Sequence, residues 1–96
     1  MTIWKLTPID LKHRDWQASR FNQEIIVRAE SEDRAREIAT SAFWTGETNP
    51  PGEEIQTNPW SQQALVSAVE IKDTSYPDTG RDEILDPEEA RAYNVA

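Results

Sequence analysis

Few residues in this chain could carry chemistry, and the first pair to weigh is His13 and Asp15. His13 is the only histidine among 96 residues. A histidine beside a carboxylate can act as a general base, but it needs a nucleophile or substrate positioned next to it. Its neighbours Lys12 and Arg14 are cations, which disfavour a protonated imidazole. We therefore expect His13 to be a solvated surface residue, and we expect no catalytic residue.

The acidic segment from Asp73 to Glu89 suggests a calcium loop. Such a loop needs oxygen ligands at its first, third and fifth positions, with glycine at the sixth. Aligning Gly80 with the glycine places Pro77 at the third position, and proline has no side-chain oxygen. Adjacent acids such as Glu88 and Glu89 do not converge on one substrate. The sequence therefore predicts no metal site and no catalytic carboxylate pair.

Composition excludes further classes of site. The chain has 3 glycines, which cannot form a dinucleotide-binding or phosphate-binding loop because none lies at the required spacing. It has no cysteine, which excludes disulfides, thiolate nucleophiles and cysteine-ligated zinc. We therefore expect no cofactor, and we expect that the protein is not an enzyme.

The charge of the chain is strongly acidic and unevenly spread. The formal net charge is −8, of which −1 lies in residues 1–48 and −7 in residues 49–96. An acidic surface repels phosphate backbones and anionic membranes. No apolar run approaches the roughly 20 residues of a membrane-spanning helix, and the N-terminus lacks the pattern of a signal peptide. We expect a cytoplasmic protein that binds neither nucleic acid nor membrane.

Hydrophobic periodicity predicts three strands and one main helix. Alternating side chains predict strands at residues 2–7, 24–29 and 64–72. Ser31 stands at a natural N-cap position, and Glu32 and Asp33 follow where the helix dipole favours negative charge. The apolar stripe of the helix then consists of Ala35, Ile38, Ala39, Ala42 and Phe43.

The order of these elements predicts an α/β (α+β) two-layer sandwich over residues 1–72. A helix between the second and third strands is a crossover, which makes those strands parallel. The first strand then lies between them in a three-stranded mixed sheet of order second, first, third. We expect Trp16, in the loop after the first strand, to fill the edge of the core. We expect Trp60 to anchor the loop that follows the helix. The face toward the helix is predicted to comprise Trp4, Leu6, Ile25, Val27, Leu65, Val69 and Ile71.

The other face of this sheet gives the main hypothesis for an interaction surface. We expect residues 73–96 to form an acidic tail that is either flexible or carries a short helix at 87–93, for which Asp86 is the expected N-cap and Pro87 the first residue. Either this tail covers the far face, or a second copy or another protein docks there. The predicted anchors of a covering tail are Ile84, Leu85 and Tyr93. The predicted interaction residues are Ile3, Ile26, Val66 and Ala68 on the far face, with Trp16 in its loop.

Four short segments carry a resemblance. They are WKLTP near the start, DWQAS at 15–19, VRAESEDRAREIA at 27–39 and NPW at 58–60. Together they resemble a group of short bacterial proteins that share a tryptophan-containing loop followed by a V-x-A-x-S-E-x-x-A-R segment. The resemblance covers the first seventy residues, and it implies no activity and no site residue.

Three functions stay open at this point. The first is a small non-catalytic domain that binds protein. The second is an acidic inhibitor or anti-defence factor that mimics nucleic acid in a basic channel, which requires carboxylates ordered in a row. The third is an enzyme, which requires a concave pocket with convergent polar groups.

Overall fold

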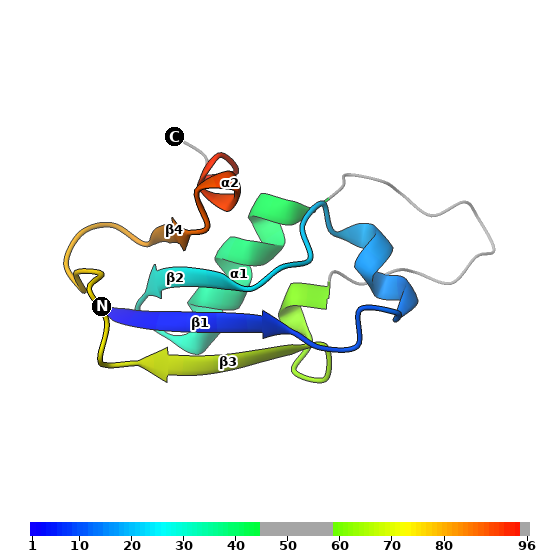
Figure 1. Cartoon of the computed structure of the whole chain (residues 1–96), viewed down its shortest axis with the longest axis horizontal. Helices are drawn as coiled ribbons and strands as arrows, with labels where there is room; N and C mark the ends of the chain where they lie inside the picture. The colour runs from blue at the N-terminus through cyan, green and yellow to red at the C-terminus, as the bar shows by residue number, and fades with distance from the viewer. Residues whose placement is uncertain (45–58, 95–96) are drawn as a thin grey trace.

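The computed structural model describes residues 1–44 and 59–94. These residues form a four-stranded sheet with one main helix against one face, as Figure 1 shows. Short 3-10 turns at Arg14–Ala18 and Pro59–Ser61 lie near one end of the sheet. The strands and helices are β1 at Thr2–Pro8, β2 at Ile25–Ala29, α1 at Glu32–Phe43, β3 at Val66–Ile71, β4 at Glu83–Asp86 and α2 at Glu88–Arg91.

The strand order is β3-β1-β2-β4, and every neighbouring pair is antiparallel. The predicted place of β1 between β2 and β3 is confirmed. The prediction of three strands in a mixed sheet is wrong, because β4 from the acidic tail pairs with the outer edge of β2. With only four residues, β4 is too short to give a periodic signal, so the sequence pattern did not reveal it.

Helix α1 begins as the sequence predicts. The hydroxyl of Ser31 accepts a hydrogen bond from the backbone N–H of Arg34 at 3.2 Å, which satisfies one of the free donors of the first turn. Ala35 and Ala39 are fully buried, and their small side chains let the helix approach the sheet closely. The predicted stop at Gly46 lies outside the described residues.

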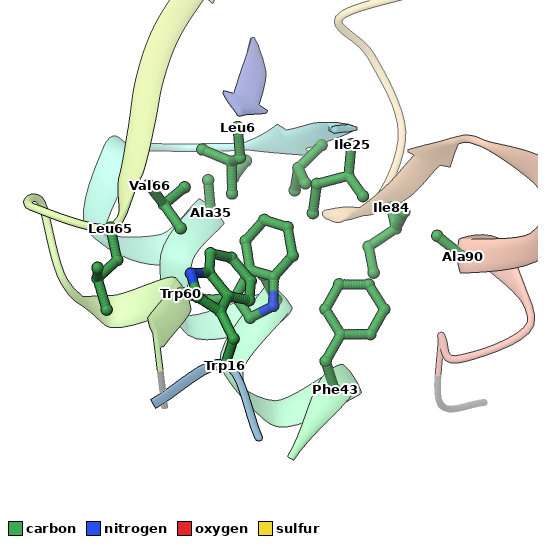
Figure 2. Packing of buried hydrophobic residues seen from close by; sticks show 13 residues of the cluster. Leu6, Trp16, Ile25, Ala35, Phe43, Trp60, Leu65, Val66, Ile84 and Ala90 are labelled. Carbon is green, nitrogen blue, oxygen red and sulfur yellow. The ribbon is translucent and has the colours of Figure 1, made fainter. Parts of the chain in front are cut away.

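Aromatic side chains close the core beyond the end of the sheet. The rings of Trp16 and Trp60 meet edge to face with their centroids 5.5 Å apart, and Phe43 lies 5.2 Å from Trp60. Figure 2 shows the side chains of Trp16 and Trp60 together, with the ring of Phe43 projecting from the end of α1 toward Ile84. Trp16 is buried at the edge of the core, as predicted, and Trp60 anchors its segment with no exposed surface.

A buried arginine ties α1 to the segment before β3. Arg36 is only 6% exposed, and its guanidinium donates to the carbonyl of Trp60 at 3.3 Å and to that of Val66 at 2.9 Å. Its Nε lies 3.1 Å from the carboxylate of Glu32, one helical turn earlier. Arg36 therefore satisfies carbonyl groups that would otherwise be buried without a partner.

The described part of the acidic tail shares the core of the rest of the chain. Ile84 of β4 and Ala90 of α2 are fully buried, and Tyr93 packs edge to face on Phe43 at 5.3 Å. Residues 83–94 therefore complete the sheet and its core. The predicted tail helix forms over Glu88–Arg91, within the predicted range.

Candidate interaction edge

His13 and Asp15 lie together, and their contacts are those of a turn. The Nδ1 atom of His13 accepts a hydrogen bond from the backbone N–H of Asp15 at 3.1 Å, which caps the 3-10 turn. One carboxylate oxygen of Asp15 accepts from the side-chain amide of Gln62 at 2.9 Å. The hydrogen bond between Asp15 and Gln62 joins the turn to the segment before β3, and Asp15 is buried between these two parts of the chain.

Several carboxylates of the described surface are paired with arginines, which neutralise their charge locally. Arg34 of α1 lies 2.7 Å from Asp82, and Arg81 lies 2.7 Å from Glu83. These pairs give no support to a row of free carboxylates. Within residues 1–44 and 59–94, no group of three metal-ligating side chains gathers. Across the same residues, no helix combines the length and apolar character that crossing a membrane requires.

The five predicted interaction residues do not share one surface. Ile3, Ile26 and Trp16 are buried, and Val66 has no exposed surface. Ala68 packs against the core on the helix side. The predicted strip of Ile3, Ile26, Val66 and Ala68 is therefore not present as a single patch on the far face.

The predicted facing of β3 is wrong by one residue. Val66 and Ala68 lie opposite Pro8 and Leu6 of β1, and they face the helix, whereas Val69 lies opposite Lys5 on the far face. The cause is Leu65, which is buried in the turn before the strand and does not take part in its alternation. Because the side chains of a strand alternate, a one-residue error in phase moves every side chain to the other face.

The connection between β3 and β4 covers one end of the far face. In Figure 1 it runs around the end of the sheet near the N-terminus. The buried guanidinium of Arg28 donates to the carbonyls of Arg81 at 2.7 Å and Pro77 at 3.1 Å. Gly80 lies so close that an added Cβ would stand 2.9 Å from this guanidinium. This segment covers part of the far face, whereas the predicted anchors Ile84 and Tyr93 pack in the main core.

Tyr76 of the same connection lies near Asp86, the last residue of β4. Burial raises the pKa of Tyr76 above its ordinary value, and a hydrogen bond to Asp86 and the charge of that carboxylate raise it further. The neutral phenol is therefore the favoured form in the fold. Tyr76 also lines a shallow hollow with Ile3 and Pro77, so the connection and the start of β1 border the same hollow.

The outer edge of β4 is closed by the chain itself. The side-chain amide of Asn94 accepts from the backbone N–H of Ile84 and donates to the carbonyl of Ile84, both at 2.9 Å. These two bonds imitate those that a neighbouring strand would make. A register shift in the pairing with β2 and the packing of α2 further obstruct this edge.

The outer edge of β3 differs in each of these respects. In the described parts of the chain, β3 pairs with β1 alone, and no other strand lies beside it. Its six residues pair with β1 without a register shift, and none of them is proline or lysine. Native proteins usually protect such an edge with bulges, prolines, lysines or a covering segment. Among residues 1–44 and 59–94, β3 therefore presents a regular strand edge without these protections.

The backbone groups available at this edge follow from the pairing pattern. Hydrogen-bonded and non-hydrogen-bonded pairs alternate along an antiparallel ladder. Pro8 has no N–H and stands opposite Val66, so Pro8 and Val66 form a non-hydrogen-bonded pair. Because the two kinds of pair alternate, the pairs that contain Ala68 and Glu70 are also non-hydrogen-bonded. These residues direct N–H and C=O away from β1. The N–H of Val66 donates to the carbonyl of Gln62, and its C=O accepts from Arg36. The outward N–H and C=O groups that a further strand could bond are therefore those of Ala68 and Glu70.

No family model matches the sequence, and no curated protein or solved structure matches it significantly. The resemblance to a group of short bacterial proteins therefore stays a prediction. The function has to be argued from the geometry of the chain, in which the contrast between the two sheet edges is the main feature.

Proposed function

We propose that this chain is a non-catalytic domain that binds protein by adding an extended strand to the outer edge of β3. The observation that supports this function is the contrast between a closed edge at β4 and an open edge at β3. In strand addition, backbone hydrogen bonds supply affinity and the alternating side chains supply selectivity. The open N–H and C=O groups of Ala68 and Glu70 are the groups that such a strand would engage.

The side chains along the edge suit a partner strand with an apolar residue at its centre. Val69 is 49% exposed on the far face, next to Lys5 of β1 and between the open positions Ala68 and Glu70. An added strand would bury this valine against a cross-strand neighbour, and such pairs stabilise sheets. Glu70 is exposed on the helix side, where a second carboxylate directly opposite it would be disfavoured.

Site-specific photo-cross-linking tests this function. A photoreactive amino acid replaces Val69 in one variant and the exposed Glu89 of α2 in a control variant, and both are expressed in the native host. We expect defined cross-linked products from position 69 and none from position 89. Adding Ala68→Pro should abolish them, because proline removes an outward N–H without disturbing the ladder to β1. Equal products from both positions, or products that survive the proline, would contradict the proposal.

A further inference from the structure

The open part of the β3 edge is short, and its length restricts the registers in which a strand can bind. Only Ala68 and Glu70 offer outward N–H and C=O groups, because those of Val66 are bonded within the chain. A partner that satisfies the edge must therefore present its own hydrogen-bonding residues at the same spacing. One strand that meets this condition is β3 of a second copy.

Two-fold symmetry allows few registers for two copies of β3. A symmetric antiparallel pair places one residue opposite its own copy at the axis. With Ala68 at the axis, Glu70 would face Val66 of the second copy, whose N–H and C=O are already bonded. With Glu70 at the axis, two like charges would stand directly opposite each other, which is destabilising.

The register centred on Val69 avoids both conflicts. In it, Ala68 of each copy stands opposite Glu70 of the other, and each such pair exchanges both of its N–H···O=C bonds. All the open outward groups of both copies are then satisfied. The two Val69 side chains meet on the far face as a non-hydrogen-bonded pair, in which side chains approach most closely.

We infer that the occupant of the β3 edge is a second copy of this chain, paired antiparallel with Val69 at the two-fold axis. This inference rests on the proposed function, since it names the partner of the same edge. It joins two four-stranded sheets into one continuous sheet. The helices of both copies then lie on the same face, because residues directly opposite each other point to the same side.

The charge of the chain determines how this association responds to salt. Each copy carries a formal net charge of −8, so the two copies repel each other at long range. Salt screens this repulsion over a Debye length of about 10 Å at 0.1 M. The paired strands bury a small area, which is typical of weak and reversible association. We therefore expect a weak dimer whose population rises with both protein and salt concentration.

Sedimentation equilibrium of the full chain, from micromolar to millimolar concentration, tests the dimer. The wild type should show a monomer–dimer equilibrium. Val69→Lys and Val69→Glu should each be monomeric, because either places like charges together at the axis. A mixture of these two variants should restore association, since the charges at the axis are then opposite. Neither substitution should disturb the fold, since Val69 is half exposed at an edge.

Leu11→Lys is the matched control, because Leu11 is 53% exposed and lies in the turn after β1, outside the paired strands. It changes the net charge by the same amount as Val69→Lys, and it should associate as the wild type does. A wild type that stays monomeric at millimolar concentration would overturn the inference, as would a Val69→Lys variant that associates like the control. If the wild type is monomeric while position 69 still cross-links to another protein, only the second copy is excluded and the proposed function stands.

Discussion

At the scale of single residues, this fold depends on polar side chains that satisfy backbone groups far away in the sequence. Arg36 bonds to the carbonyls of Trp60 and Val66, and Arg28 bonds to those of Pro77 and Arg81. Both guanidiniums are buried. Removing one partner of a buried hydrogen bond leaves the other partner unsatisfied, so each arginine is a point at which one substitution should have a large effect.

Replacing Arg36 with methionine should lower the free energy of unfolding by about 3 kcal/mol, because it leaves buried carbonyls without a donor. Urea unfolding followed by far-UV circular dichroism measures this loss. Arg34→Met is the matched control on the same helix, since the ion pairs of Arg34 are exposed and should contribute much less. Equal losses in the two variants would show that the contacts of Arg36 do not hold α1 to the segment before β3.

These residue roles could not be predicted from the sequence. The partners of Arg28 lie 49 and 53 residues away, and no local pattern announces such contacts. The same holds for Trp60 and Ser19, whose side chains are joined by a 2.8 Å hydrogen bond across 41 residues. By contrast, the N-cap of Ser31 is local to its helix, and the sequence predicted it correctly.

At the scale of elements, the sheet has one edge that is closed and one that is open. Asn94 and α2 close β4, whereas β3 is regular and unprotected in the described parts of the chain. The sequence predicted α1 and three strands because their hydrophobic periods are long and regular. It missed β4, which is short, and it placed β3 in the wrong phase because Leu65 and Val66 are consecutive buried residues.

Asn94→Ala should open the edge of β4. The substitution removes both bonds to Ile84, and it should cost about 1–2 kcal/mol of stability and speed amide hydrogen exchange at Ile84. Asn22→Ala is the control, because Asn22 is exposed and lies before β2. Residue-resolved exchange by NMR measures the effect. An Ile84 amide that stays equally protected in the variant would mean that the side chain of Asn94 does not close this edge.

At the scale of the whole molecule, residues 59–94 of the acidic second half are part of the folded body. The sequence alone predicts a domain of residues 1–72 followed by a tail, because the composition changes at that point. Yet Ile84, Ala90 and Tyr93 all contact the main core, and β4 completes the sheet. An uneven charge therefore does not mark a boundary of packing in this chain.

Truncation tests the role of the second half directly. A chain that ends at residue 82 loses β4 and α2, exposes the outer edge of β2 and leaves Phe43 without the ring of Tyr93. We expect it to lose cooperative thermal unfolding, whereas a chain that ends at residue 94 should keep it. Thermal denaturation followed by circular dichroism measures both. A stable, cooperatively folded fragment of residues 1–82 would contradict this account and support an autonomous 1–72 domain.

The most direct test of the central claim is amide hydrogen exchange at the two sheet edges of the wild-type chain. At low protein concentration, the amides of Ala68 and Glu70 should exchange much faster than that of Ile84, because their N–H groups point outward from β3 while Asn94 bonds the N–H of Ile84. The control amide is that of Val69, which bonds inward to β1 and should be protected. Slow exchange of Ala68 and Glu70 in the dilute monomer would show that the β3 edge is already covered, and it would contradict strand addition at β3.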